Sequence, residues 1–260
     1  MLKLSKRLQT IADLVAPGTR VADIGSDHAL LPTYLVQTGR SPSAIAGELN
    51  AGPLAAAKKQ VKEAGLEAKI DVRQGDGLDV LQAGEADAVT IAGMGGCLMA
   101  AILSRGAAAG KLDGVRELVL QPNVGEELVR SWLLDEGWLL TAEEIVEEDG
   151  RWYEVLRAVR SSDADALNGK LYDTSFLPSG IGQERGRRLL LRMGPLLLRR
   201  GEPLLGAKWA HELEKMEYIC RQLSLSETPE AKEKEAGLRR DMDEIKEVLA
   251  CLPMDKRSCS

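Results

Sequence analysis

The stretch VADIGSDHALLP at 21–32 decides the fold, because a short apolar run leads through an acidic residue and a glycine into a helical pattern. A strand that turns into a helix in this way begins a βαβ unit. Gly25 at the turn lets a ligand approach the backbone, and the helix that follows offers free N–H groups. The second and third glycines of a GxGxxG pattern are missing, and Asp27 stands in the place of the second. A dinucleotide pyrophosphate is therefore disfavoured, whereas the Asp27 carboxylate suits a cationic sulfonium.

Residues 21–160 alternate short β-branched apolar runs with longer helical patterns, which is typical of an open, doubly wound α/β sheet. The last two strands are separated only by EEDGR, so they form an antiparallel hairpin. A parallel sheet closed by such a hairpin is typical of S-adenosylmethionine (SAM) methyltransferases more than of nicotinamide dehydrogenases. We therefore predict a Rossmann-like class I methyltransferase domain over residues 1–160. Its strands are predicted at Arg20–Ile24, Ala44–Glu48, Ile70–Gln74, Ala88–Ala92, Glu117–Gln121, Trp138–Val146 and Trp152–Val159.

Residues 161–260 are predicted to form a second, helical domain. Residues 161–183 are rich in Ser, Asp, Gly and Pro and indicate a linker. Beyond them, two segments joined by SLSETPE carry apolar residues at spacings of 3 and 4, which predicts an antiparallel coiled-coil hairpin. Two amphipathic helices docked on the sheet are the alternative, and Pro253–Ser260 are expected to be disordered. The seam residues are Trp209, Leu213, Met216, Cys220 and Leu223, then Leu238, Met242, Ile245, Leu249 and Leu252.

The composition excludes several classes of protein. The 260 residues are 44% hydrophobic and 28% charged, which fits a globular protein of one or two domains. No apolar run approaches the roughly 18 residues of a membrane-spanning helix, and the amino end lacks a signal-peptide core. The cysteines form no CxxC pair and only two histidines occur, so we expect a cytoplasmic protein without metal or disulfides. The cysteines are Cys97, Cys220, Cys251 and Cys259.

The distribution of charge indicates a polyanionic partner. The formal net charge is −6, which by itself argues against nucleic acid. The stretch 185–200, however, contains arginines and no carboxylate, and this local excess of positive charge suits phosphate groups. Its arginines are Arg185, Arg187, Arg188, Arg192, Arg199 and Arg200.

Polar or glycine-rich residues follow four successive predicted strands, where open α/β sheets bind their ligands. Glu48 lies 23 residues after Gly25 and can accept both hydroxyls of a ribose. Asp76 can accept from an adenine amino group beside the N–H of Gly77, unless it is only a turn residue. The glycines of IAGMGG leave room for a flat ring against Met94, or form a tight turn. The predicted cofactor-binding residues are Asp23, Gly25, Ser26, Asp27, His28, Glu48, Leu49, Asp76, Gly77, Gly93 and Met94.

Six motifs occur in one order along the chain: LSKRL at 4–8, ADIGSDHALLP at 22–32, GELNAGP at 47–53, GDGL at 75–78, IAGMGG at 91–96 and QPN at 121–123. In this order they resemble the bacterial tRNA adenine-N1 methyltransferase family TrmK, over about the first 160 residues. GPLLLR at 194–199 resembles the carboxyl-terminal part of that family less specifically. The resemblance implies SAM as cofactor, tRNA as partner, a coiled-coil appendage, and methylation of adenine 22 in the D-arm. We further expect a monomer.

The chemistry at N1 narrows the catalytic candidates. N1 carries an in-plane lone pair, so attack on the sulfonium methyl requires alignment rather than a strong base. Methylation leaves the ring cationic, and Asp27 can stabilise that charge or instead contact the cofactor. AGMGG stands where methyltransferases of exocyclic amines carry Asn/Asp-Pro-Pro-aromatic, which favours a ring nitrogen. Asn123 can reach the target base or cap a helix. His28 can bind the cofactor carboxylate or the substrate, or it caps a helix or packs as an imidazole.

Cations for RNA are predicted in two places. Lys3, Lys6 and Arg7 share one face of an opening helix by their spacing, and a solvated face is the alternative to phosphate contact. The LSKRL resemblance favours Arg7, which joins Asp27 and Asn123 as a catalytic candidate. The predicted substrate-binding residues are Lys3, Lys6, Arg7, Arg185, Arg187, Arg188 and Arg192.

Two other functions stay open from the sequence. A small-molecule SAM methyltransferase is favoured if the arginines of 185–200 pair with glutamates and the appendage covers a closed pocket. A non-catalytic RNA-binding protein with a vestigial cofactor site would fail to bind SAM. A nicotinamide oxidoreductase is the least supported class, because the pyrophosphate glycines and an acid–base pair are lacking.

Overall fold

The computed structural model describes residues 2–178 and 180–251. The chain divides between Asn168 and Gly169 into two compact units, each described here by itself. The division falls within a short helix, α6 (Ala164–Leu171), in the segment that the sequence predicts as a linker. In the described parts of the chain, no helix is both long and apolar enough to cross a membrane.

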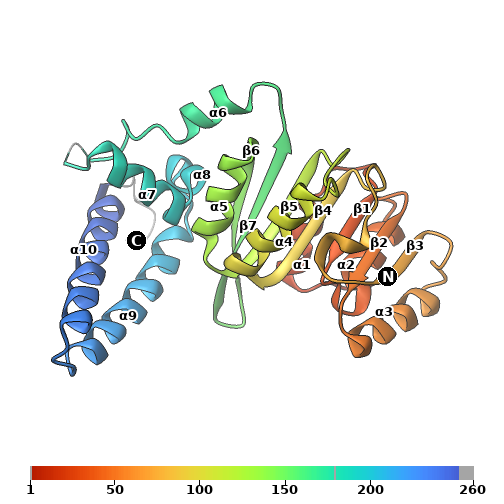
Figure 1. Cartoon of the computed structure of the whole chain (residues 1–260), viewed down its shortest axis with the longest axis horizontal. Helices are drawn as coiled ribbons and strands as arrows, with labels where there is room; N and C mark the ends of the chain where they lie inside the picture. The colour runs from red at the N-terminus through yellow and green to blue at the C-terminus, as the bar shows by residue number, and fades with distance from the viewer. Residues whose placement is uncertain (1, 179, 252–260) are drawn as a thin grey trace, which may run out of the picture. The chain divides into compact units, whose positions relative to one another are not determined.

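The first unit is a seven-stranded sheet with helices on both faces (Figure 1). The strand order is β3-β2-β1-β4-β5-β7-β6, in which β1 to β5 are parallel and β6 and β7 form an antiparallel hairpin. All seven predicted strands are present, which confirms the predicted fold. The strands are β1 (Val21–Ile24), β2 (Ala44–Glu48), β3 (Ile70–Gln74), β4 (Ala88–Gly95), β5 (Glu117–Val124), β6 (Trp138–Glu148) and β7 (Arg151–Arg160). The helices are α1 (Lys6–Leu14), α2 (Leu30–Gln37), α3 (Ala51–Glu63), α4 (Gly96–Ala108) and α5 (Glu126–Asp135), with short 3-10 helices at Asp27–Ala29 and Gly77–Val80.

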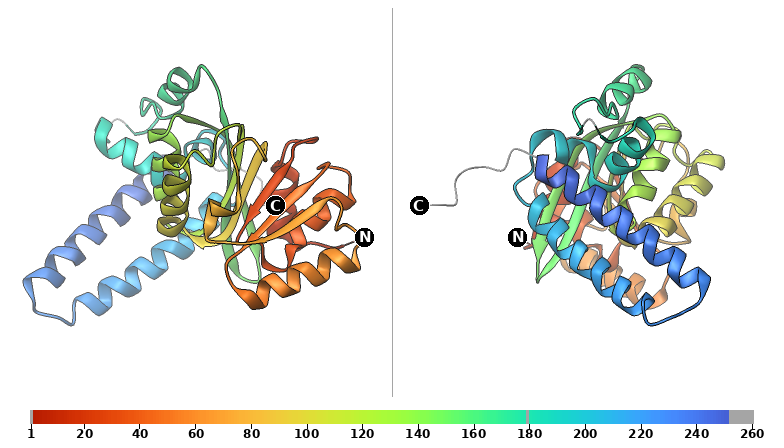
Figure 2. Two further views of the ribbon diagram at one scale, coloured as in Figure 1. Left: turned by 45° about the vertical axis from the view of Figure 1, so that its right-hand side comes forward. Right: turned by 90° about the vertical axis from the view of Figure 1, so that its left-hand side faces the viewer.

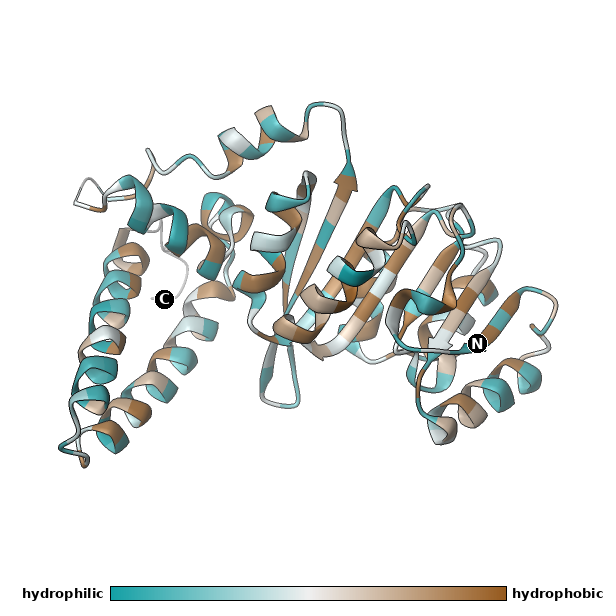
Figure 3. Ribbon diagram, in the orientation of Figure 1, coloured by the Kyte–Doolittle hydropathy of each residue, from teal (hydrophilic) through white to brown (hydrophobic). Residues whose placement is uncertain are grey.

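The two faces of the sheet are covered by different helices. Apolar side chains of α1, α2 and α3 pack on one face, and α4 and α5 lie in front of the other in Figure 1. Figure 3 shows that the strands between them are largely hydrophobic. Side chains alternate between the faces of a strand, so the register places Asp23, Thr90 and Gln121 on the face that α1 covers. The position of α1 therefore determines which of its side chains contact these polar residues.

Strands β4 and β5 run further than the sequence predicts. Met94 and Asn123 lie inside the strands, with register shifts around Met94, and β4 passes directly into α4 at Gly95 and Gly96, as in the alternative of a tight strand-to-helix turn. Asn123 does not cap α5, because Gly125, at φ 76°, precedes that helix. The extension carries both residues beyond the ends of the neighbouring strands, to the edge where a ligand can reach them.

The second unit contains a helical hairpin. α9 (Leu205–Leu223) and α10 (Pro229–Cys251) run antiparallel and side by side (Figures 1 and 2), and Figure 3 shows apolar residues recurring along both. α7 (Gln183–Met193) and α8 (Pro195–Arg200) precede them. The hairpin forms as predicted, while its supercoiling stays a prediction, and Leu252 and Pro253–Ser260 lie outside the described residues. The buried hairpin residues include Trp209, Met216, Cys220, Met242, Ile245 and Val248, whereas the predicted Leu213, Leu223, Leu238 and Leu249 are half-buried.

Candidate active site

The carboxyl ends of the first parallel strands meet around Gly25. The N–H groups of Gly25 and Ser26 both donate to the carbonyl of Gly47, each at 2.9 Å. Gly25 has φ 72°, and a Cβ placed on it would lie 2.3 Å from Met94 Cε. The left-handed backbone conformation favours glycine here, and a Cβ would also force the end of the Met94 side chain to move. The flexible Met94 side chain therefore lies over the glycine turn, as expected for a residue that lines a ligand site.

Glu48 offers an oriented carboxylate at this edge. It ends β2 with only 7% of its surface exposed. Its Oε1 accepts hydrogen bonds from the backbone N–H of Asn50 at 2.8 Å and from the Asn50 side chain at 3.3 Å. A carboxylate with further acceptor capacity suits a vicinal diol. The next residue, Leu49, exposes its apolar side chain beside it.

Asp23 is a buried carboxylate beneath the Gly25 turn. Thr90 donates to its Oδ1 at 2.6 Å. Burial raises the pKa of Asp23, and the hydroxyls of Ser26 and Thr90 together with the charge of Arg7 only partly oppose that effect. The negative charge of Glu48 raises the pKa of Asp23 further. The site therefore holds a carboxyl group whose charge is disfavoured by its surroundings.

We expect Asp23→Asn to stabilise the fold at alkaline pH. The folded protein favours neutral Asp23, so the stabilising contribution of this group is complete below about pH 3.9 and is lost as the pH rises through its raised pKa. The amide keeps an acceptor for Thr90 and carries no charge. At pH 8 the variant should unfold about 2–4 °C or more above the parent, a gap that closes near pH 4. Thermal unfolding followed by circular dichroism measures the difference in unfolding temperature. Equal unfolding temperatures of the variant and the parent at pH 8 would contradict a destabilising charge on Asp23.

Asp27 and His28 lie on the open side of the turn. The Asp27 side chain is 77% exposed, and His28 Nε2 lies 3.3 Å from its Oδ1. The predicted helix-cap role of His28 is wrong, because no side chain caps α2. Instead His28 and Ala29 have φ of 58° and 50°, a left-handed conformation that is costly outside glycine. Such strain is typical of turns that hold functional side chains in place.

Asp76 is paired with a residue that the sequence analysis missed. Arg105 of α4 lies 3.0 Å from Asp76 Oδ2, and both side chains are about half exposed. Gly77 has φ 57°, and a Cβ placed on it would lie 2.8 Å from Ile102 Cγ2. Packing against α4 therefore requires the glycine. The pairing holds Asp76 at the edge while its other oxygen can still accept a hydrogen bond.

A hydrogen-bonded set around Gln121 joins two of the predicted catalytic residues. Gln121 is completely buried, and its Oε1 accepts from Arg7 Nη1 at 2.6 Å and from the N–H of Gly93 at 3.1 Å. Its Nε2 donates to the carbonyl of Pro122 at 2.8 Å and to Asn123 Oδ1 at 3.2 Å. Asn123 Nδ2 donates to the carbonyl of Gly93 at 2.8 Å. Sequence reasoning missed Gln121, although it is the first residue of the QPN motif.

The predicted shared helix face of Lys3, Lys6 and Arg7 is wrong. Lys3 precedes α1, and both lysines are exposed, whereas Arg7 turns toward the strand ends. The Arg7 guanidinium lies 5.4 Å from the ring centre of Tyr153 and is held there as a cation–π contact. The amino-terminal helix thus delivers one cation to the edge of the sheet.

Four of the six clustered arginines are engaged within the second unit. Arg185 pairs with Glu244 at 2.7 Å, Arg192 with Asp241 at 2.8 Å, and Arg200 with Glu202 at 2.7 Å. Arg199 donates to three backbone carbonyls. Arg187 and Arg188 are exposed, and among the described residues no ion pair or hydrogen bond holds their side chains. The prediction that all six arginines are available for phosphate is therefore wrong. Among the described residues, two of the six arginines have no ion pair or hydrogen bond to their side chains.

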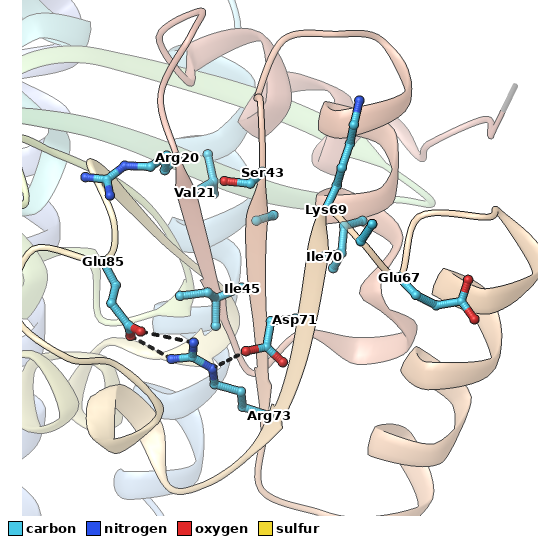
Figure 4. A pocket seen from close by; sticks show the side chains of 12 residues that line it. Arg20, Val21, Ser43, Ile45, Glu67, Lys69, Ile70, Asp71, Arg73 and Glu85 are labelled. Atoms are coloured by element: carbon cyan, nitrogen blue, oxygen red, sulfur yellow. Dashed lines mark hydrogen bonds and ion pairs between the residues drawn. The ribbon is translucent and has the colours of Figure 1, made fainter.

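The opposite end of the strands carries a different hollow (Figure 4). It has a volume of about 320 Å³ and is lined by the first residues of β1, β2 and β3. Arg73 lies 2.7 Å from Asp71 and 2.6 Å from Glu85, and this pairing lowers the pKa of Glu85. Its central charges are thus satisfied internally. Among the described residues no cluster of His, Cys, Asp and Glu is arranged to hold a metal ion.

Comparison with known proteins decides between the open alternatives. The family model described as "TrmK: tRNA (adenine(22)-N(1))-methyltransferase" matches residues 21–247. The chain belongs to the TrmK family. This membership supports the tRNA methyltransferase over the small-molecule enzyme, the vestigial RNA-binding protein and the oxidoreductase.

Relatives of the TrmK family match nearly the whole chain. The tRNA (adenine(22)-N(1))-methyltransferase of Bacillus subtilis is 45% identical over 249 residues, which cover 95% of this chain and 98% of that protein. The crystal structure of the B. subtilis TrmK superposes with a TM-score of 0.81 at 44% identity, covering 96% of this chain and all of that one. A Streptococcus pneumoniae structure in complex with SAM is 38% identical, with a TM-score of 0.76, and covers 95% and 100% of the two chains.

The residues present fit the SAM of a TrmK family member. Gly25 forms a turn that a Cβ would fill, and Glu48 supplies acceptors for a ribose diol. Asp76 and the N–H of Gly77 offer an acceptor and a donor to an adenine edge. The carboxylates at this edge also suit a positively charged sulfur. These residues lie at the ends of adjacent strands, so one elongated ligand can reach them all.

Proposed function

We propose that this chain methylates N1 of adenine 22 in tRNA, with SAM at the carboxyl ends of β1 to β4 and the target base beside Asn123. The observation that supports this arrangement is that Glu48 and the Gln121 set lie on one edge of the sheet. Glu48 ends β2 and Asn123 is the residue before the last of β5, and these two strands are three strand spacings apart, which is roughly 14 Å. A ribose, its sulfonium methyl and a purine ring placed in sequence span about that length.

We assign the cofactor contacts to the residues around the first four strand ends. Glu48 accepts the ribose hydroxyls, and Asp76 with Gly77 binds the adenine of SAM. Gly25 allows close approach, and Met94 moves aside or lies against the ligand. The remaining cofactor contacts are assigned to Asp23, Ser26, Asp27, His28, Leu49 and Gly93. When bound, SAM supplies a methyl group on a positively charged sulfur.

The chain needs to orient the adenine rather than deprotonate it. N1 attacks with its own lone pair, so no residue has to remove a proton before transfer. Asn123 Oδ1 accepts from Gln121 and keeps a second lone pair, which can accept from the exocyclic amine next to N1. A guanine carries an acceptor at that position, so this contact selects adenine. Asp27 is the anionic group that can balance the positive ring charge during transfer, whereas Arg7 is assigned the role of holding Gln121 through its guanidinium.

We assign catalysis to the domain 1–160 and tRNA docking to 161–260. Arg187 and Arg188 are the candidates for phosphate contacts in the second domain, because the ion pairs of Arg185 and Arg192 occupy their guanidinium groups. Lys3 and Lys6 are the exposed cations of the amino end. Phosphate contacts position the RNA, while the site edge selects the base. We further propose that the protein acts as a monomer in the cytoplasm, where tRNA is modified.

Reversing the two free arginines should weaken tRNA binding and spare SAM binding. Arg187→Glu with Arg188→Glu removes two cations and adds two anions, so tRNA affinity should fall roughly tenfold or more near 0.15 M salt. The salt dependence of the remaining affinity should be shallower. Filter binding measures tRNA and calorimetry measures SAM, with Arg187→Lys and Arg188→Lys as the charge-preserving control. Equal tRNA affinity in the reversed and control variants would exclude a docking role.

The test of the reaction is incubation with methyl-labelled SAM and unmodified tRNA, followed by nucleoside mass spectrometry. We expect 1-methyladenosine, and its loss when adenine 22 of the transcript is replaced by guanine. Label in N6-methyladenosine, or label that persists after the replacement, would contradict the proposal. No label in any nucleoside would contradict the activity itself.

A further inference from the structure

Apolar side chains gather in solvent at the same edge of the first unit. Of its described large hydrophobic residues, five are exposed, and four of these lie at or shortly after strand ends of the carboxyl edge. Two of the four lie together where β5 leads into α5: Val124 is 66% exposed and Leu128 45%, and a Cβ on Gly125 between them would lie 3.5 Å from Leu128 Cδ1. We call these two residues the apolar rim. Leu98 is on the flank of α4 that Ile102 and Arg105 share, away from α5, and Leu49 follows β2; the fifth exposed residue, Leu167, lies on α6.

Close backbone packing makes the apolar rim continuous with the site. Val124 pairs with Gly95, and a Cβ on that glycine would lie 3.9 Å from Val124 Cγ2. The first turns of α4 and α5 converge, since a Cβ on Gly96 would lie 2.0 Å from the carbonyl oxygen of Gly125. Val124 directly follows Asn123 in β5. A substrate base held at Asn123 therefore brings its neighbours over the rim.

We propose that the apolar rim binds the face of an unstacked nucleobase next to the target adenine, an inference that rests on the proposed function. N1 lies on the Watson–Crick edge, so the target must leave its pairing and stacking partners before it reacts. The neighbouring base then loses a stacking contact and exposes an apolar face. Aliphatic side chains can take that place, as they do when proteins insert wedges between bases. The rim replaces part of the stacking that extrusion removes.

The neighbourhood of the rim favours a base over other occupants. Glu127, which is exposed in the first turn of α5, repels phosphate, so the RNA presents a base here rather than its backbone. Two side chains are also too few for a stable dimer, which buries about 800 Å² on each partner. The rim therefore fits a small flat apolar group beside the catalytic edge.

The test replaces the rim with polar side chains of similar size: Val124→Thr and Leu128→Gln together. The control is Leu167→Gln, a leucine of the same unit that is 40% exposed outside the site edge. We expect KM for tRNA to rise about tenfold or more, from the stacking contributed by one base. The Kd of SAM should stay within about threefold. Leu128→Met should keep the parental KM, because the apolar surface remains.

Each outcome decides one statement. If the double variant has the tRNA kinetics of Leu167→Gln, the proposed role of the rim is overturned, while the parental activity still supports the proposed function. A weakened Kd for SAM assigns the rim to the cofactor pocket, and a change in sedimentation of the free protein assigns it to a self-association surface; either result overturns the inference. Absence of methylation by the parent chain would instead overturn the proposed function.

Discussion

Glu48→Gln should lower the affinity for SAM by at least about a hundredfold. One Glu48 oxygen is already oriented by the backbone N–H of Asn50, and the buried carboxylate has no competing solvent shell. Each hydrogen bond to a charged group contributes about 1.5–3 kcal/mol, so two ribose hydroxyls account for that loss. The amide replaces one acceptor by a donor that faces a hydroxyl. Isothermal titration calorimetry with SAM measures the change.

The matched control for this variant is Glu63→Gln, at the exposed end of α3. It removes the same charge from the same unit without touching the site edge, so the variant should bind SAM with the affinity of the parent protein. Circular dichroism verifies that both variants are folded. An affinity of Glu48→Gln equal to that of the control would exclude Glu48 from the cofactor site.

Gln121→Glu should lower kcat for tRNA methylation about a hundredfold while SAM still binds within about threefold of the parental Kd. The carboxylate keeps the acceptor for Arg7 and Gly93 but loses both N–H donors. A buried acceptor then faces the oxygens of Pro122 and Asn123, which costs free energy unless the Asn123 amide turns over. The turned amide presents N–H groups to the exocyclic amine of adenine. Single-turnover kinetics and calorimetry separate the two effects.

The test of this positioning role is a double-mutant cycle with Asn123→Ala. If Gln121 acts through Asn123, adding Gln121→Glu to Asn123→Ala should change kcat far less than it does in the parent chain. Gln121→Leu removes all four contacts of the side chain and is expected to lower the unfolding temperature as well. Equal losses of kcat from Gln121→Glu in both backgrounds would contradict the positioning role.

The arrangement of the sheet could be predicted because its strands are buried apolar runs with distinct ends. Ala44–Glu48 is the same strand in the sequence prediction and in the structure, and this placed Glu48 at the site edge. The extension of β5 through Asn123 could not be predicted, because proline and asparagine both disfavour a strand. Its continuation depends on pairing with β4, a tertiary contact that no local pattern reveals.

The hydrogen-bond and ion-pair partners of the side chains could not be predicted from the sequence for the same reason. Gln121 resembles any polar residue at a strand end until Arg7, more than a hundred positions away, is placed beside it. Likewise Arg185 appears free in its own segment, and its partner Glu244 lies 59 positions further along the chain. Local patterns thus located the edge of the site, whereas the pairing of its charges depends on long-range packing.

The most direct test of the central claim is a crystal structure of this protein with SAM. The account predicts the ribose hydroxyls on the Glu48 carboxylate, the ligand against Gly25, and the sulfonium methyl directed toward the side of Asn123. SAM bound in the hollow at the amino ends of the strands, or bound with Glu48 turned away from the ribose, would contradict it.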